Sequence, residues 1–170
     1  MIRIMLVEDH AVVREALRSM LEREPDMQVV AEAGDGESAL RLARDLAPEL
    51  VVMDISMPGL DGIQTTRRLL AGNPVIKVLA LSTYRDRRVI QQILDAGAAG
   101  YVVKSAAGAE LRRGIRAVVA GRSYLCPEAA EAVADGLRAL KQGHGQALSR
   151  RERQVLALIV EGKTSSDIAD

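Results

Sequence analysis

Apolar and polar residues alternate in blocks along the first 121 residues of the chain. Five short apolar runs have the length of a strand, and five longer segments repeat apolar side chains every three or four residues, as an amphipathic helix does. The predicted strands are 2–7, 28–33, 50–54, 75–81 and 100–103, and the predicted helices are 10–24, 38–46, 63–71, 85–96 and 109–120. This strict alternation, with short connections, predicts one doubly wound α/β domain with a five-stranded parallel sheet.

The pattern changes after Gly121, where the strand signal ends. Pro127 suits the first turn of a helix, and apolar residues at helical spacing follow it as far as Leu140. A polar, glycine-containing stretch then leads to a second helical unit, in which Ser149 suits an N-cap and Glu152 holds the capping-box position. We therefore expect three parts: a domain at 1–121, a helical and flexible linker at 122–147, and the beginning of an all-α unit at 148–170.

The amino-acid composition argues against several classes of function. Lys and Arg total 23, as do Asp and Glu, so the charge balance favours neither a nucleic-acid nor a membrane partner. The chain has no Trp, no Phe and three Tyr, which disfavours a function built on aromatic stacking. The lone cysteine, Cys126, suits a reducing compartment, and the sequence has neither a bilayer-length apolar run nor a signal-peptide layout. We expect a cytoplasmic protein that does not contact a membrane.

Polar side chains follow the predicted strands where each strand ends. They are Glu8, Asp9, Asp54, Ser82 and Lys104. The carboxyl ends of parallel strands open onto one crevice, so these side chains should meet there. Two carboxylates about 5 Å apart repel each other by roughly 3 kcal/mol at an effective dielectric constant near 20, so three of them require protonation or a cation. An all-oxygen cluster suits Mg²⁺, and a carboxylate beside a cation and a lysine is a candidate nucleophile for phosphoryl transfer.

Four segments of the first 121 residues resemble the receiver domain of bacterial two-component response regulators. They are Val-Glu-Asp-His at 7–10, Met-Asp-Ile-Ser-Met-Pro-Gly-Leu-Asp-Gly at 53–62, Ala-Leu-Ser-Thr at 80–83 and Gly-Ala-Ala-Gly-Tyr-Val-Val-Lys at 97–104. The resemblance implies a flavodoxin-like fold in which Asp54 accepts a phosphoryl group from a phosphohistidine on a sensor histidine kinase. It also implies a phosphoacceptor with phosphorylation and dephosphorylation chemistry of its own, and not an enzyme that turns over a substrate.

The same resemblance implies a metal site. Asp9 and Asp54 would bind Mg²⁺ together with the backbone carbonyl of Ser56, and Glu8 would act mainly through water.

The resemblance also implies a switch. Lys104 would contact the phosphoryl group, and the Ser82 hydroxyl would shift toward it on activation. Tyr101 holds the aromatic switch position and would swing inward when that hydroxyl moves. We expect phosphorylation to repack the surface formed by 85–96, 100–103 and 109–120, and to support a homodimer through that surface or through the first and last helices. Ser105 departs from the family pattern, because many receivers have proline directly after the lysine.

Residues 148–169 resemble the start of a LuxR-type helix-turn-helix domain, which together with the receiver resemblance implies the NarL/FixJ group of DNA-binding response regulators. The resemblance covers the first helix and the opening of the next, so we expect a truncated domain without the recognition helix that enters the major groove. The full-length protein would bind DNA to regulate transcription, whereas this chain as it stands would not.

Two other functions stay open at this point. One is a Mg²⁺-dependent phosphatase with Asp54 as nucleophile, but such an enzyme needs a second acid two residues later, where Ser56 stands. The other is a receiver that acts through protein contacts alone, with the C-terminal tail as a partner-binding helix.

Overall fold

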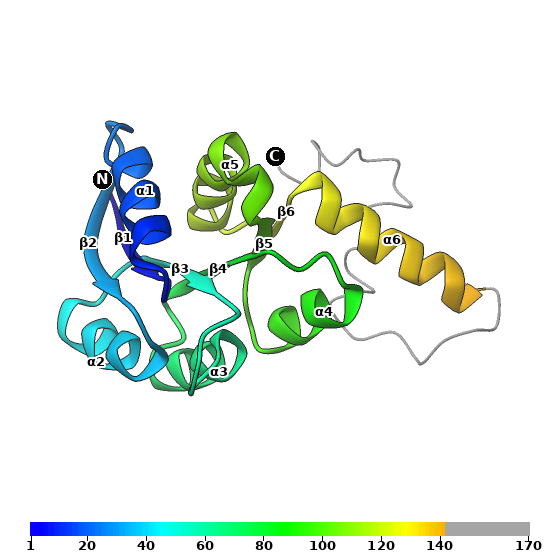
Figure 1. Ribbon diagram of the computed structural model, residues 1–170, viewed down its shortest axis with the longest axis horizontal. Helices are drawn as coiled ribbons and strands as arrows, with labels where there is room; N and C mark the ends of the chain where they lie inside the picture. The colour runs from blue at the N-terminus through cyan, green and yellow to red at the C-terminus, as the bar shows by residue number, and fades with distance from the viewer. Residues whose placement is uncertain (142–170) are drawn as a thin grey trace.

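A computed structural model describes residues 1–141, in which β/α units are arranged about one parallel sheet (Figure 1). The strands are β1 (Ile2–Val7), β2 (Met27–Ala33), β3 (Leu50–Asp54), β4 (Lys77–Ser82), β5 (Gly100–Val103) and β6 (Tyr124–Leu125). The helices are α1 (Ala11–Leu21), α2 (Gly36–Leu46), α3 (Gly62–Gly72), α4 (Arg87–Asp95), α5 (Ala107–Val119) and α6 (Pro127–Lys141), with the 3-10 turn η1 (Lys104–Ala106) after β5. Every element predicted within 1–141 is present, and its ends agree to within a few residues. The unit expected at 148–170 lies outside the described residues.

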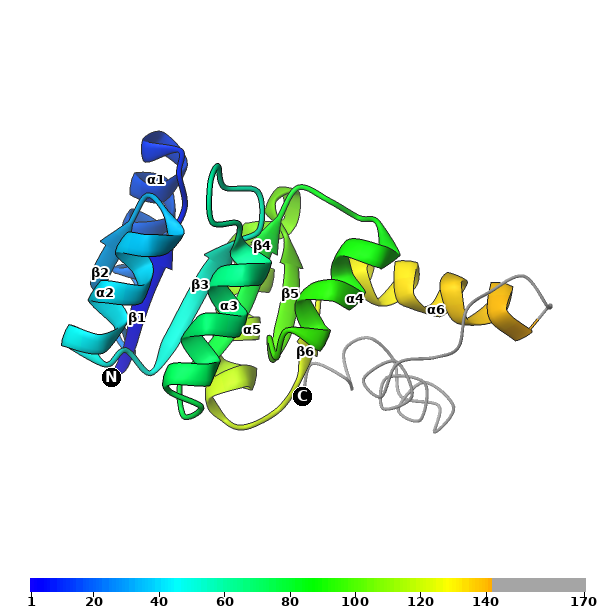
Figure 2. The ribbon, with the colours of Figure 1, turned by 90° about the horizontal axis from the view of Figure 1, so that it is seen from below.

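All the strands are parallel and lie in the order β2-β1-β3-β4-β5-β6. Helices α1 and α5 cover one face of the sheet and α2, α3 and α4 cover the other, as Figures 1 and 2 show from two directions. This arrangement confirms the predicted flavodoxin-like fold. It also brings the carboxyl ends of β1, β3, β4 and β5 to one edge of the sheet.

The sheet has one strand more than the five that the pattern predicts. Tyr124 and Leu125 pair with Gly100 and Tyr101 of β5. A two-residue strand is too short to leave a periodic signal, and its pairing depends on close packing. A Cβ on Gly100 would lie 2.6 Å from the Tyr124 carbonyl oxygen, and one on Gly114 would lie 2.9 Å from the Tyr124 ring. The two glycines therefore make the room that β6 occupies.

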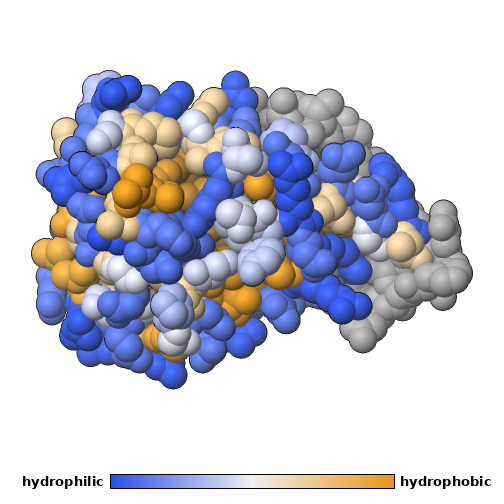
Figure 3. Space-filling model, in the orientation of Figure 1, coloured by the Kyte–Doolittle hydropathy of each residue, from blue (hydrophilic) through white to orange (hydrophobic). Residues whose placement is uncertain are grey.

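The core is aliphatic and centres on β1, β3 and β4, whose residues Ile4–Val7, Leu50–Asp54 and Val78–Ser82 are all buried. Helices on both faces of a parallel sheet explain why these strands are apolar runs instead of alternating patterns. Each fully buried Leu, Ile, Val or Met side chain contributes about 1.5–3 kcal/mol to folding. On the face seen in Figure 3, apolar residues lie in small groups among hydrophilic ones, with no single large apolar patch.

Three helices begin directly after a capping aspartate. In each case the carboxylate accepts a hydrogen bond from a backbone N–H in the first turn, at 2.7 Å for Asp35, 2.8 Å for Asp61 and 2.8 Å for Asp86. A cap of this kind is worth about 1 kcal/mol. The cap at Asp61 matters for the site, because it ends the loop that follows β3 and Asp54. At the other end of α4, Gly97 has the positive φ of 106° that a left-handed cap requires.

Helix α6 packs against α4 and against strands β5 and β6. It begins at Pro127, as predicted, and buries Ala129, Ala130, Val133 and Leu137. A Cβ on Gly136 would lie 1.9 Å from Cδ of Arg87, so the absence of a side chain there lets the arginine of α4 lie across α6. Within residues 1–141, no helix combines the length and the apolar character needed to cross a membrane.

Candidate functional site

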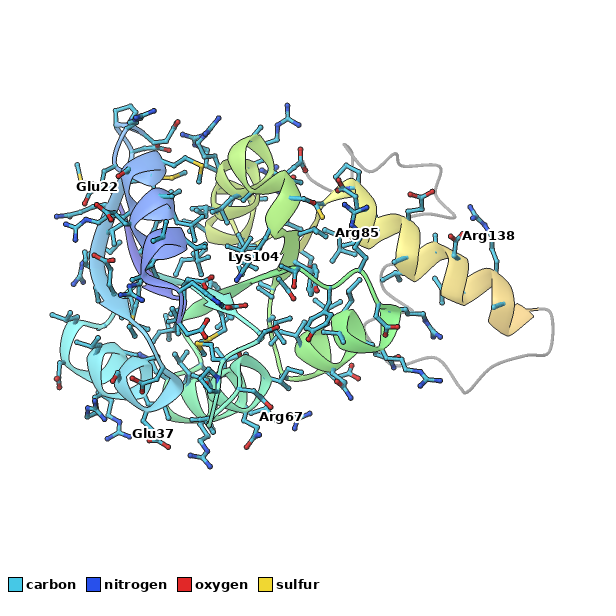
Figure 4. All side chains as sticks on the ribbon, viewed as in Figure 1. Glu22, Glu37, Arg67, Arg85, Lys104 and Arg138 are labelled. Atoms are coloured by element: carbon cyan, nitrogen blue, oxygen red, sulfur yellow. The ribbon has the colours of Figure 1, made fainter. Side chains whose placement is uncertain are left out.

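The strand register places Glu8, Asp54 and Lys104 next to one another. Val7 pairs with Met53, so the residues that follow them, Glu8 and Asp54, lie side by side at the sheet edge. The ammonium Nζ of Lys104 lies 2.6 Å from Oε2 of Glu8 and 2.9 Å from Oδ2 of Asp54. Figure 4 shows the Lys104 side chain reaching from the end of β5 toward the central strands. The three side chains of Glu8, Asp54 and Lys104 therefore meet at the carboxyl ends of the strands, as predicted.

Burial dominates the electrostatics of this contact. The side chains of Glu8 and Asp54 are each 1% exposed and that of Lys104 is 17% exposed. Loss of water raises the pKa of Asp54, and the hydrogen bonds from Lys104 and Ser56 only partly oppose that shift. Burial also opposes the charged form of Lys104, but its hydrogen bonds to Glu8 and Asp54 outweigh burial and raise its pKa. Lys104 therefore stays charged, but it divides its charge between two buried carboxylates and cannot compensate Asp54 fully.

Asp9 completes an acidic cluster, which we define as Glu8, Asp9 and Asp54. These three carboxylates and His10 offer ligand atoms that all lie within 4.8 Å of one another. The lysine supplies one positive charge against three carboxylates, which leaves a negative excess that a divalent cation would neutralise. The donors are mainly oxygens and Asp9 is partly open to water, so the cluster fits the ligand preference of Mg²⁺.

His10 is a residue that sequence reasoning left out of the site. We expected a helix-start residue, and His10 is the N-cap of α1, but without a side-chain capping bond. Its Nδ1 instead lies 2.9 Å from Oδ1 of Asp9 and 3.0 Å from Oε1 of Glu8. The carboxylates raise the pKa of His10, first through the hydrogen bond to Glu8 and then through the charge of Asp9. Its position directly after two acids was the available signal.

A tight loop after β3 holds Asp54 from the other side. The backbone N–H of Ser56 donates to Oδ1 of Asp54 at 3.1 Å, and the N–H of Gly62 donates to the Ile55 carbonyl at 3.0 Å. A Cβ on Gly62 would lie 2.1 Å from the Asp54 carbonyl oxygen, so only glycine allows the loop to close this tightly. Gly59 turns the loop with a φ of 76°. In the Gly-Leu-Asp-Gly sequence, the two glycines therefore allow the loop to close, and the aspartate caps the helix that follows.

Ser82 and Tyr101 lie next to the cluster on β4 and β5 and are both fully buried. The Ser82 hydroxyl accepts a hydrogen bond from the backbone N–H of Tyr84 at 3.2 Å, and the Tyr101 hydroxyl donates to the Tyr84 carbonyl at 2.8 Å. Burial raises the pKa of Tyr101 to about 12, although contact with Ser82 opposes the shift. Both side chains therefore hold the backbone of the loop between β4 and α4.

Arg14 is a second residue that sequence reasoning missed. Its guanidinium donates to the backbone carbonyl of Glu8 at 2.6 Å and lies 3.5 Å from the carboxylate of Glu32. The contact ties α1 to the end of β1 and so fixes the backbone from which Glu8 and Asp9 project. No local pattern in the sequence identifies this role.

Models of known protein families match two parts of this chain. Residues 4–116 match the family model of the response regulator receiver domain, and residues 146–170 match that of bacterial regulatory proteins of the luxR family. The second match lies outside the described residues.

Characterised relatives cover the whole chain. It is 36% identical over 172 residues to the transcriptional regulatory protein LiaR of Bacillus subtilis, a match that spans 100% of this chain and 82% of LiaR. It is 39% identical over 177 residues to the response regulator GacA of Pseudomonas viridiflava, across 100% of this chain and 80% of GacA. Among solved structures, a LuxR-family two-component response regulator from Aurantimonas sp. SI85-9A1 is 41% identical, with a TM-score of 0.76 over 78% of this chain and 95% of that one.

Proposed function

We propose that this chain, which belongs to the response regulators that join a receiver domain to a LuxR-family domain, is switched by transfer of a phosphoryl group to Asp54. The donor would be a phosphohistidine on a sensor histidine kinase. An Asp54 carboxylate oxygen attacks phosphorus, the phosphorus–nitrogen bond breaks, and the released imidazole nitrogen takes a proton from solvent. Asp54 is thus a phosphoryl acceptor that is phosphorylated and later dephosphorylated, and not the nucleophile of an enzyme that turns over a separate substrate.

The observation that carries this proposal is the ion-paired, buried carboxylate of Asp54. Its Oδ2 lies 2.9 Å from Nζ of Lys104, and its Oδ1 accepts a hydrogen bond from the Ser56 N–H at 3.1 Å. Both oxygens are therefore held in one orientation at the carboxyl end of β3. Lys104 is then placed to contact the oxygens of an incoming phosphoryl group, where a fixed positive charge stabilises the charge of the transition state.

A divalent cation would bind between Asp9 and Asp54, with the backbone carbonyl of Ser56 as a further ligand and Glu8 acting mainly through water. Mg²⁺ supplies charge neutralisation for the phosphoryl oxygens when bound. The residues of the chain do the rest: Lys104 and the Ser56 N–H hold Asp54, and Arg14 holds the backbone of Glu8.

We propose Ser82 and Tyr101 as the switch. In this structure the Tyr101 ring is already inside, with its hydroxyl on the Tyr84 carbonyl. Movement of the Ser82 hydroxyl to a phosphoryl group on Asp54 breaks its contact with the Tyr84 N–H. Of the two contacts that hold the loop before α4, only that of Tyr101 with the Tyr84 carbonyl is then left, so α4 is the element that we expect to repack.

The output of the switch is regulation of transcription, in keeping with the two matched domains. We propose that the domains divide at 1–121, 122–147 and 148–170, that phosphorylation favours a homodimer through α4, β5 and α5, and that the full-length protein then binds DNA in the cytoplasm. Helix α6 already packs on α4 and β5, so dimerisation and the linker compete for the same elements. The LuxR-family match supports this route over a receiver that acts through protein contacts alone.

The test is phosphoryl labelling. We would incubate wild type, Asp54→Asn and Asp61→Asn with acetyl phosphate and Mg²⁺ and measure the intact mass. Wild type should gain one base-labile phosphoryl group and Asp54→Asn none. Asp61→Asn is the matched control, because Asp61 caps α3 outside the acidic cluster, and it should label like wild type. Equal labelling of Asp54→Asn and wild type would overturn the proposal.

A further inference from the structure

The imidazole of His10 lies on the outer side of the acidic cluster. The side chain is 69% exposed, whereas that of Glu8 beneath it is 1% exposed. Its backbone is held on both sides: the N–H donates to Oε1 of Glu8 at 3.1 Å and the carbonyl accepts from the Arg14 N–H at 3.0 Å. These two contacts fix the backbone from which the ring projects, directly beside the carboxylates.

The positions of the donor atoms suit a single ion. Adjacent ligands of an octahedral ion with bonds of about 2.1 Å lie about 3 Å apart, and opposite ligands lie about 4.2 Å apart. Nδ1 of His10 lies 2.9 Å from the Asp9 oxygen and 3.0 Å from the Glu8 oxygen, which matches adjacent ligands. All four candidate donor atoms lie within 4.8 Å of one another, a span close to that of the ligands of one ion, with Glu8 acting through water.

The chemistry of the fourth donor differs from that of the other three. Carboxylate oxygens are hard ligands that suit Mg²⁺, whereas an imidazole nitrogen favours first-row transition metals, with affinity rising from Mn²⁺ to Co²⁺. We propose that His10 is a fourth protein ligand at the acidic cluster and makes the site prefer Mn²⁺ and Co²⁺ over Mg²⁺. The inference rests on the proposed function only in placing a divalent cation between Asp9 and Asp54.

The experiment compares metals on the complete chain without any phosphoryl donor. Mn²⁺ binding is measured by electron paramagnetic resonance, Mg²⁺ binding by competition, and nitrogen coordination by the ¹⁴N coupling in pulsed spectra of bound Mn²⁺. The variants are His10→Asn, which keeps a side chain suited to an N-cap, and His144→Asn. The chain has two histidines, so His144→Asn removes the other imidazole and is the matched control.

Wild type and His144→Asn should show ¹⁴N coupling, and His10→Asn should lose it. The ratio of Mn²⁺ to Mg²⁺ affinity should fall by about tenfold in His10→Asn and stay unchanged in His144→Asn. Coupling that persists in His10→Asn, or an unchanged affinity ratio, would overturn the assignment of His10 and leave the carboxylate site standing. Equal Mn²⁺ affinity of wild type and Asp9→Asn would overturn the cation site as well. Phosphoryl labelling of Asp54 reports separately on the proposed function.

Discussion

Two groups of acidic and basic side chains lie at opposite ends of the sheet and behave in opposite ways. At the carboxyl ends of the strands, Lys104 is buried with the acidic cluster. At the other end, just before β2, lies a surface ion-pair cluster, which we define as Glu24, Asp26, Arg112 and Arg116. Arg116 binds Asp26 with two nitrogens, each at 2.8 Å, and Glu24 at 2.6 Å.

The pKa values of the two aspartates show what the difference means. Burial raises the pKa of Asp54 despite its lysine partner, whereas the hydrogen bond from Arg116 lowers the pKa of the exposed Asp26. Its surroundings thus disfavour ionisation of the buried carboxylate, whereas those of the surface carboxylate favour it. Similar residue types therefore form a buried contact in one place and a weak surface attraction in the other, because Asp54 is shielded from water and Asp26 is not.

The largest expected effect comes from closing the space beside Asp54. Gly62→Ala places a Cβ 2.1 Å from the Asp54 carbonyl oxygen, and backbone cannot yield as a flexible side chain does. We expect a loss of stability of about 3 kcal/mol, measured by urea unfolding, together with weaker phosphoryl labelling.

Gly108→Ala is the control for that variant. A Cβ on Gly108, in α5, meets nothing within 4 Å, so alanine should raise stability by about 0.5–1 kcal/mol through helix propensity. A Gly62→Ala protein as stable as Gly108→Ala would show that the loop after β3 is not held by close packing.

Asp54→Asn should increase the stability of the protein, whereas Gly62→Ala decreases it. Asp54→Asn removes a disfavoured charge, so without divalent metal at pH 7 the variant should be more stable than wild type by about 0.5–2 kcal/mol. The pKa of Asp54 is raised in the folded state, so its titration stabilises the wild type fully only below the unfolded value of 3.8, and this stability is lost as the pH rises through the folded pKa. The advantage of Asp54→Asn should therefore shrink as the pH falls from 7 to about 4.

The same comparison of stability should be repeated in the presence of Mg²⁺. The cation should stabilise wild type more than Asp54→Asn, because only wild type keeps all three carboxylates. A wild type that is more stable than Asp54→Asn in the absence of metal would show that Lys104 compensates Asp54 fully.

The smallest effect is expected at the surface ion-pair cluster. Asp26→Asn should cost at most about 1 kcal/mol, because exposed ion pairs are screened by water. The pKa of Asp26 is lowered in the folded state, so the contribution of Asp26 is present above pH 3.8 and is lost as the pH falls through the folded pKa.

Thermal unfolding of wild type and Asp26→Asn between pH 7 and pH 2 measures that loss, and 1 M salt should reduce the difference at pH 7. If Asp26→Asn were to cost more than Gly62→Ala, the contrast between the two ends of the sheet would be wrong.

Much of this site was predictable because it depends on where strands end. Asp54 follows a run of apolar residues and Lys104 follows another, and parallel strands bring such positions together whatever the details of packing. The contacts of Arg14 and Gly62 were not predictable in that way, because each depends on how closely a helix or a loop approaches the end of a strand, which the pattern does not specify. The contacts of His10 with Glu8 and Asp9 are local, and its position directly after the two acids was the signal for them.

Periodicity and chain connectivity can be read along the chain, so the order of strands and helices, the parallel sheet and the residues at the carboxyl ends of its strands were all predictable before the structure. Three further features emerge only from the folded chain: Lys104 shares its charge between Glu8 and Asp54, His10 and Asp9 come within reach of Asp54, and Tyr124 and Leu125 add a sixth strand. These outcomes depend on register, burial and close approach between distant residues, and water access then sets the direction in which the pKa of each carboxylate moves.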